Sequence, residues 1–136
     1  ALICLRCGYL INGRLRDLLG KNYYSCPQCK SLAITVVKGD GLKEREIVLK
    51  NIKGVKISGE EKKILEDLRR RSLLLRNHGE IALIALTAPG VGVNDVASIV
   101  NRVESGEDLF RVLYDYEKRA IRAMQFIRSK DKSTGS

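Results

Sequence analysis

The sequence lacks the long apolar segment that a membrane-spanning helix needs, since no apolar run reaches about 18 residues. It also has no signal-peptide pattern, and it begins with Ala1 rather than Met, so we expect a processed chain or a piece of a longer one. With 136 residues there is room for one domain or two very small ones. These features argue against a membrane protein and against a large multi-site enzyme, and we expect a cytoplasmic location.

Catalytic motifs are missing as well. The chain contains neither Gly-x-x-x-x-Gly-Lys-Ser/Thr nor an Asp-Glu-x-His box, so we expect no ATP hydrolysis by these residues. Its single histidine, His78, has no obvious carboxylate partner, and no Ser/His/Asp or Cys/His constellation is visible. The sequence therefore predicts a chain that is not an enzyme by itself.

Acidic and aromatic residues are both scarce. Lys and Arg total 25 against 16 Asp and Glu, which gives a net charge of +9. A surplus of this size favours a polyanionic partner, usually nucleic acid, although many basic surfaces are only solvated. Aromatic residues make up 5%. Only Tyr9, Tyr23 and Tyr24 are placed where a base can stack on the N-terminal segment, and packing in the core or in a hairpin is the alternative for each of them. At 44% hydrophobic, the chain can still build a core.

All four cysteines lie in the first 29 residues, as Cys4-Leu-Arg-Cys7 and Cys26-Pro-Gln-Cys29. Two C-x2-C pairs separated by eighteen residues match the pattern of a four-cysteine zinc ribbon. Each pair forms a tight turn that directs two thiolates to one point, and Gly8 suits the left-handed backbone that such a turn often needs. Four thiolates leave no open coordination position, so we expect a structural Zn²⁺ on Cys4, Cys7, Cys26 and Cys29, without zinc catalysis.

Two disulfides or a redox pair are the alternatives for these cysteines. Cysteines three apart rarely bridge each other, and nothing in the sequence suggests secretion. A redox C-x-x-C would need one pair inside a βα unit rather than two matched pairs. A metal ion would instead replace the core that about 40 residues cannot supply.

The segments around the cysteines have the pattern of β-strands. Residues 1–3 enter the first turn, residues 23–24 lead into the second, and the β-branched run 32–37 leaves it. Apolar residues occupy both alternating sets of positions in that run, which predicts that both faces of the strand are buried. The ribbon, residues 1–39, carries a net charge of +5. Its candidate nucleic-acid contacts are Arg6, Arg14, Arg16, Lys21 and Lys30.

Residues 40–57 form a connector that the sequence leaves open, as a short helix followed by extended chain or as another strand pair. Residues 58–78 have the pattern of an amphipathic helix, with a capping box at Ser58 and Glu61 and a stop at Gly79. Its apolar face carries Ile64, Leu65, Leu68, Ser72 and Leu75. Its arginine run is either a set of phosphate contacts or part of a solvated, ion-paired face: Arg69, Arg70 and Arg71.

A short apolar helix is expected at 80–86, and Gly90-Val91-Gly92 then precedes another apolar helix. This stretch resembles the hairpin of a helix-hairpin-helix motif, in which glycine N–H groups and a helix N-terminus bind phosphate. Residues 77–116, however, carry a net charge of −4, which favours a turn that only packs the helices. Both alternatives stay open for Gly90 and Gly92.

The last helix is expected from about residue 107 to residue 128, after a sequence that resembles a capping box, Ser105-Gly-Glu-Asp108. Its predicted buried stripe is Leu109, Leu113, Tyr116, Ala120, Met124 and Ile127. Its far end is basic and contributes Arg119 and Arg122 as candidate nucleic-acid contacts, and residues 131–136 are expected to be disordered. The predicted fold class is α+β: a small antiparallel zinc ribbon (1–39), the connector (40–57) and an all-α bundle of about four helices (58–130).

This order of elements resembles the C-terminal domain of archaeal large helicase-related (Lhr-type) superfamily 2 helicases. The resemblance is carried by residues 4–9 with 26–29, by residues 90–100, and by the spacing of Glu117, Arg122 and Phe126. Lys30 departs from the family pattern, which commonly has glycine after the fourth cysteine; Val93 replaces a proline and Ile127 a common tryptophan.

The resemblance implies an accessory domain beside a helicase motor, with single-stranded DNA or RNA and the remainder of the helicase polypeptide as partners. Two other functions stay open. One is a zinc-ribbon module that binds other proteins, and the other is a stand-alone DNA-repair or transcription factor. An upstream motor in the same reading frame would eliminate the last.

Overall fold

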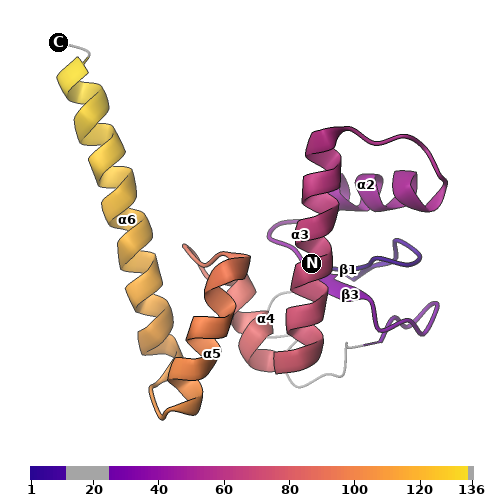
Figure 1. Cartoon of the computed structure of the whole chain (residues 1–136), viewed down its shortest axis with the longest axis horizontal. Helices are drawn as coiled ribbons and strands as arrows, with labels where there is room; N and C mark the ends of the chain where they lie inside the picture. Colours follow the sequence, from indigo (N-terminus) through magenta and orange to yellow (C-terminus); the bar gives the residue numbers. More distant parts are fainter. Residues whose placement is uncertain (12–24, 135–136) are drawn as a thin grey trace. The chain divides into compact units, whose positions relative to one another are not determined.

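The computed structural model describes the backbone of residues 1–11 and 25–134, and their side chains as far as Gln125. This part of the chain forms a three-stranded antiparallel sheet followed by helices, which confirms the predicted α+β class (Figure 1). The chain divides into two compact units, Ala1–Thr87 (the first unit) and Ala88–Ser136 (the second unit). The division falls inside the range 58–130 that the sequence suggested as a single bundle.

The sheet of the first unit is small, and two of its three strands are buried. Strand β1 (Leu2–Cys4) lies between β2 (Leu10–Ile11) and β3 (Ile34–Val36), and both pairings are antiparallel. Successive side chains of a strand point to opposite faces, yet every residue of β1 and β3 is buried, whereas the edge strand β2 is half-buried. Both faces of β3 are therefore buried, which confirms the prediction for residues 34–37, whereas Leu32 lies before the strand and is 54% exposed. The strand expected at 23–24 lies outside the described residues.

The connector contains a helix, α2 (Leu42–Ile52), so the first of the two open alternatives is the one observed. Gly41 precedes it with φ +74°, and a Cβ there would lie 2.9 Å from Cδ1 of Leu10. The Asp40 carboxylate accepts a hydrogen bond from the Leu42 N–H at 3.1 Å. A glycine is needed at this turn because the backbone is left-handed and passes close to the sheet.

Helix α3 (Gly59–His78) begins with the predicted capping box. The Glu61 N–H donates to the Ser58 hydroxyl at 3.1 Å, and the Ser58 N–H donates to the Glu61 carboxylate at 3.1 Å. The predicted face is buried at Leu65, Leu68, Ser72 and Leu75 and half-buried at Ile64. Gly79 ends the helix with φ +62°, and α4 (Glu80–Thr87) follows directly.

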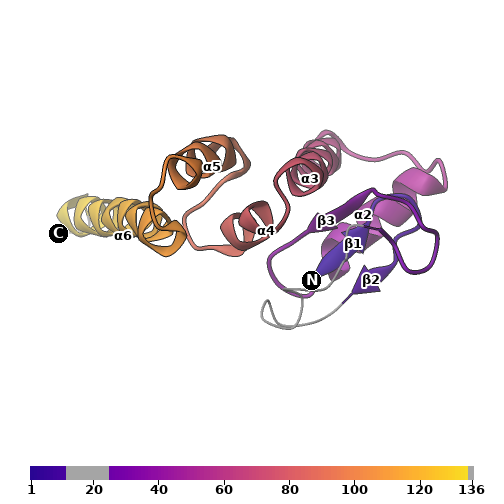
Figure 2. The same cartoon turned by 90° about the horizontal axis from the view of Figure 1, so that it is seen from below.

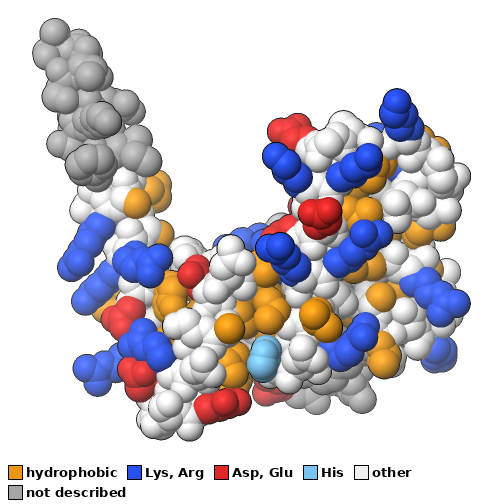
Figure 3. All heavy atoms as spheres, viewed as in Figure 1, with side chains coloured by type: hydrophobic (Ala, Val, Ile, Leu, Met, Phe, Trp, Pro, Cys, Tyr) orange, Lys and Arg blue, Asp and Glu red, His pale blue; other side chains and the backbone are white. Residues whose placement is uncertain are grey.

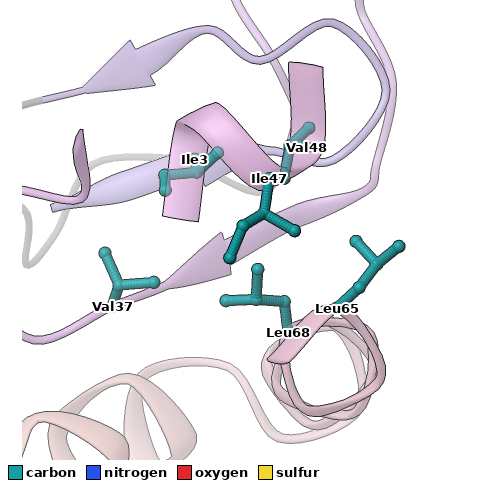
Figure 4. Close-up of a cluster of buried hydrophobic side chains, with 6 residues drawn as sticks. All are labelled: Ile3, Val37, Ile47, Val48, Leu65 and Leu68. Carbon is teal, nitrogen blue, oxygen red and sulfur yellow. The ribbon is translucent and has the colours of Figure 1, made fainter. Parts of the chain in front are cut away.

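Helices α2 and α3 pack on the sheet through one apolar cluster (Figures 2 and 4). Figure 4 shows these side chains pointing toward one another from β1, from the end of β3, and from both helices. The cluster consists of Ile3, Val37, Ile47, Val48, Leu65 and Leu68. The ribbon therefore shares its core with the helices that follow it, and the first unit is one packed body rather than a ribbon and a linker.

The second unit contains a short 3-10 turn η1 (Val93–Asp95), α5 (Val96–Glu104) and α6 (Leu109–Thr134). Its buried side chains are Val91, Val96, Ile99, Val100, Val112, Leu113 and Tyr116. None of the helices in the described part of the chain is long and apolar enough to cross a membrane.

Three details of the last helix differ from the sequence prediction. It begins at Leu109, because the Asp108 carboxylate, rather than Ser105, caps it by accepting the Arg111 N–H at 3.1 Å. It continues to Thr134, into the segment expected to be disordered. In the predicted stripe, Met124 is 57% exposed, whereas Val112, outside the stripe, is buried. The side chain of Ile127 lies outside the described residues.

Two leucines of α3 test how far the shared core stabilises the first unit. Leu68 is 2% exposed and Leu73 is 54% exposed. Leu68→Ala is expected to lower the free energy of unfolding by about 2–5 kcal/mol, since it leaves a cavity against the sheet. The matched change Leu73→Ala, in the same helix, is expected to stay within about 0.5 kcal/mol. Urea unfolding followed by circular dichroism measures both, and equal effects would contradict the described packing.

Candidate metal centre and basic surface

The sulfur atoms of the four cysteines all lie within 4.8 Å of one another. The Sγ atoms of Cys4 and Cys29 are 3.5 Å apart, and those of Cys7 and Cys26 are 3.6 Å apart. Four thiolates bound tetrahedrally to one ion at about 2.3 Å would be separated by about 3.8 Å, whereas a disulfide requires about 2.05 Å. All four cysteines are free. The cluster can hold one metal ion, and the thiol geometry fits that use better than two disulfides.

Two equivalent turns position the sulfurs. The N–H of Gly8 donates to the carbonyl of Cys4 at 2.8 Å, and the N–H of Lys30 donates to the carbonyl of Cys26 at 2.9 Å. Both donors have a left-handed backbone, with φ +79° at Gly8 and +64° at Lys30. The residue after the second cysteine of each pair therefore has the same conformation, which the sequence predicted only for Gly8.

The surroundings of the two turns explain why only one of them has glycine. A Cβ at Gly8 would lie 2.7 Å from Cδ2 of Leu49, whereas Lys30 is exposed. A residue with a side chain in the left-handed region destabilises the fold by about 1–2 kcal/mol. Lys30 can adopt this conformation because its side chain is exposed. The α2 helix also holds the first turn, because Nε of Arg45 donates to the Gly8 carbonyl at 3.1 Å.

The free thiols differ in acidity. Burial raises the pKa of the Cys4 thiol to about 12. Burial also acts to raise the pKa of Cys26, but the N–H groups of Cys29 and Gln28 stabilise its thiolate and lower the pKa to about 7. Because a metal ion binds thiolates, it must displace these protons, and binding weakens as the pH falls.

The basic residues singled out from the sequence are distributed over both units. Arg6 and Lys30 are exposed on the two cysteine turns, and Arg69 and Arg70 are exposed on α3. Arg71 is half-buried and forms an ion pair with Asp67 at 2.7 Å, so it is less available than its neighbours. Arg119 and Arg122 are exposed on α6, in the other unit. Arg14, Arg16, Lys21, Tyr23 and Tyr24 lie outside the described residues.

The charge surplus belongs almost entirely to the first unit. Residues 1–87 contain seventeen Lys and Arg against nine Asp and Glu, a net charge of +8, whereas residues 88–136 contain eight against seven. In the second unit, the Arg102 guanidinium bonds the carboxylates of Glu107 at 2.8 Å and Asp115 at 3.0 Å, and these bonds raise its pKa. On the face in Figure 3, Lys and Arg side chains lie over α3, with some Asp and Glu side chains among them, and further Lys and Arg side chains lie over α6.

Two clefts on the first unit are lined by cations that the sequence analysis did not select. One, of about 360 Å³, lies where the end of β3, α2 and α3 meet, and the other, of about 480 Å³, lies between the end of α2 and α3. Helical periodicity places Lys63, Asp67 and Arg71 on one face of α3. Only the tertiary fold brings residues from α2 and from the end of β3 to the same cleft. The missed cations are Lys38, Lys43 and Lys63 in the first cleft and Lys56 and Lys62 in the second.

The Gly90-Val91-Gly92 turn packs closely on α6. Gly90 has φ +75°, and a Cβ there would lie 2.7 Å from the carbonyl oxygen of Tyr116. The N–H of Gly92, one of the groups that would face a phosphate in a helix-hairpin-helix motif, donates instead to the Asp95 carboxylate at 2.8 Å. Both contacts favour the alternative in which the hairpin only packs the helices.

Comparisons with known proteins add no assignment: no family model, no curated protein and no solved structure matches the chain.

The two glycines of the hairpin allow a direct test of its role. Gly90→Ala is expected to destabilise the second unit by at least about 2 kcal/mol, because it combines left-handed backbone strain with a clash. Gly92 has an ordinary φ of −102°, and its Cβ would meet only Asp95 Oδ2 at 3.5 Å. Gly92→Ala is therefore expected to leave thermal unfolding and nucleic-acid affinity unchanged. Lost affinity with unchanged stability would show that the hairpin binds phosphate.

Proposed function

We propose that this chain is a nucleic-acid-binding module with a structural Zn²⁺, and that it serves as the accessory module of an ATP-dependent helicase. The observation that carries the proposal is the concentration of positive charge on the unit built around the four-cysteine cluster. The zinc orders a small sheet, the sheet positions α2 and α3, and these helices present lysine and arginine side chains to phosphates.

Zinc is the ion that best suits the cluster. Four cysteine thiolates arranged as a tetrahedron are typical of structural zinc sites, and soft sulfur ligands disfavour Mg²⁺ and Ca²⁺. Cys4 and Cys26 are buried and the other two are half-buried, so the ion would be shielded by protein on several sides. With all four positions filled by sulfur, the ion would have a structural rather than a catalytic role.

Removal of the metal tests this assignment. We expect one zinc per chain by elemental analysis, and we expect chelation to lower both the helical circular dichroism signal and the melting temperature, since α2 and α3 share their core with the sheet. Added Zn²⁺ should restore both. A Cys4→Ser/Cys26→Ser variant should melt early and be insensitive to chelator. Unchanged dichroism and melting after complete zinc removal would contradict the proposal.

Phosphate contact is supported by charge and exposure. Lys62, Lys63, Arg69 and Arg70 are exposed along α3, and none of them forms an ion pair with another described residue. Contacts of this kind neutralise phosphates whatever the base sequence, so binding should tolerate sequence changes. The helicase context depends on the resemblance carried by residues 4–9 with 26–29, by residues 90–100, and by Glu117, Arg122 and Phe126. Recovery of the full-length gene with an upstream motor would test it.

The salt dependence of binding tests the nucleic-acid role. Fluorescence anisotropy with labelled single-stranded DNA and RNA should show affinity that falls linearly with the logarithm of salt, by about 0.7 log units per phosphate contact for each tenfold change. The whole chain, zinc-loaded, is the sample, and a neutral polymer of similar length is the control. Affinity that is undetectable at low salt, or that does not change with salt, would overturn the proposal.

A protein-interaction module is the second candidate, and one observation favours it. On α6, four large apolar side chains are 47–70% exposed along one side of the helix: Phe110, Tyr114, Ile121 and Met124. Such a stripe suits an apolar segment of another protein. A partner that stays bound in a pull-down after nuclease treatment would favour this candidate over the first.

A further inference from the structure

The cleft of about 360 Å³ on the first unit has a polar rim and an apolar floor. Val37 and Leu68 are only 4% and 2% exposed, and Ile64 is half-buried, so these side chains lie at the bottom. The charged side chains of Lys38, Lys43 and Lys63 are exposed and lie around the opening. Three different elements supply them: the chain after β3, α2 and α3.

The acidic groups of the cleft do not cancel its positive charge. The Asp67 carboxylate is already paired with Arg71 at 2.7 Å. Glu44 is the remaining anion of the lining, against three lysines that form no ion pair with any described residue. An anionic ligand entering this cleft would therefore meet a net positive rim within a short range.

The size and chemistry of the cleft suit one nucleotide. A volume of about 360 Å³ lies at the small end of the range for sites that bind small organic ligands. A nucleobase is flat and largely apolar on its faces, as the floor is, and the phosphates on either side of it carry the negative charge that the rim attracts. A base held in a duplex is stacked and paired, and cannot reach such a floor without being unpaired.

We propose that this cleft binds one nucleotide of a single strand, with the base on Val37, Ile64 and Leu68 and the adjacent phosphates on Lys43 and Lys63. The proposal rests on the nucleic-acid role given above and deepens it, because it assigns the preferred strand form and the contact residues. The second cleft is not a continuation of the first, because Lys62 and Lys63 are consecutive in α3 and project about 100° apart, each into the lining of a different cleft.

The experiment compares two double variants that lose the same charge. Lys43→Ala/Lys63→Ala removes two rim cations, whereas Lys53→Ala/Arg76→Ala removes two exposed cations of the same unit that line neither cleft. Binding of labelled oligothymidine to the zinc-loaded chain is measured by anisotropy across a salt series. We expect the cleft variant to bind on the order of tenfold more weakly near 0.1 M salt, with a salt slope smaller by about 1.4, and the control to change much less.

The nucleic acid is varied in parallel to test the floor. The wild-type chain should bind the single strand at least as tightly as a duplex of equal length, although the duplex has the higher charge density. A strand of the same length with abasic sites should bind several-fold more weakly, because it leaves the floor uncovered. Melting temperatures of all variants should stay close to that of the wild type, since the replaced side chains are exposed and only that of Arg76 donates a hydrogen bond to another described residue, at 3.4 Å to the Leu32 carbonyl.

The outcomes separate this proposal from the broader one. If the wild-type chain shows no salt-dependent binding, the nucleic-acid role itself fails. If it binds but the two double variants lose affinity equally, binding is spread over the basic surface and the cleft proposal is overturned. If the abasic strand binds as well as oligothymidine, or if the duplex binds more tightly than the single strand, the floor holds no base, and the proposal is overturned as well.

Discussion

The convergence of four sulfur atoms at one point is the constraint on which the first unit depends. Its strands are only two or three residues long, too short to form a stable sheet alone. The cysteine turns fix one end of this sheet, and α2 and α3 cover it through a shared apolar cluster. The clefts that carry the cationic side chains are bounded by the same elements, so the basic surface depends on the four-cysteine cluster and the sheet for its shape.

The basic surface is thus linked to the cysteine cluster through packing rather than through direct contact. The lysines around the first cleft are held in place because the helices and the strand end that bear them pack on the sheet. In the second unit the numbers of acidic and basic residues nearly balance, and Arg102 bonds two carboxylates. The two units therefore differ in electrostatic character, and the first unit carries +8 of the chain's net charge of +9.

The glycine hairpin illustrates how local chemistry can imitate a binding motif. Its sequence resembles a phosphate-binding turn, but the Asp95 carboxylate accepts the hydrogen bond of Gly92 that a phosphate oxygen would accept. Gly90 is required for a different reason, since α6 passes too close for any side chain. In this chain both glycines therefore have a sufficient explanation in packing and in an internal hydrogen bond.

The sequence by itself determined the features that depend on short-range chemistry. The cysteine spacing predicted that four cysteines come together, the Ser58–Glu61 box predicted the start of α3, and apolar periodicity predicted its buried face. Caps, turns and helix faces involve residues a few positions apart, so a local pattern can reveal them. It left the connector open and misplaced Met124, because burial there depends on which elements pack together. Only the tertiary structure decided that Lys38, Lys43 and Lys63 share a cleft, since they lie on three separate elements and no local pattern relates them.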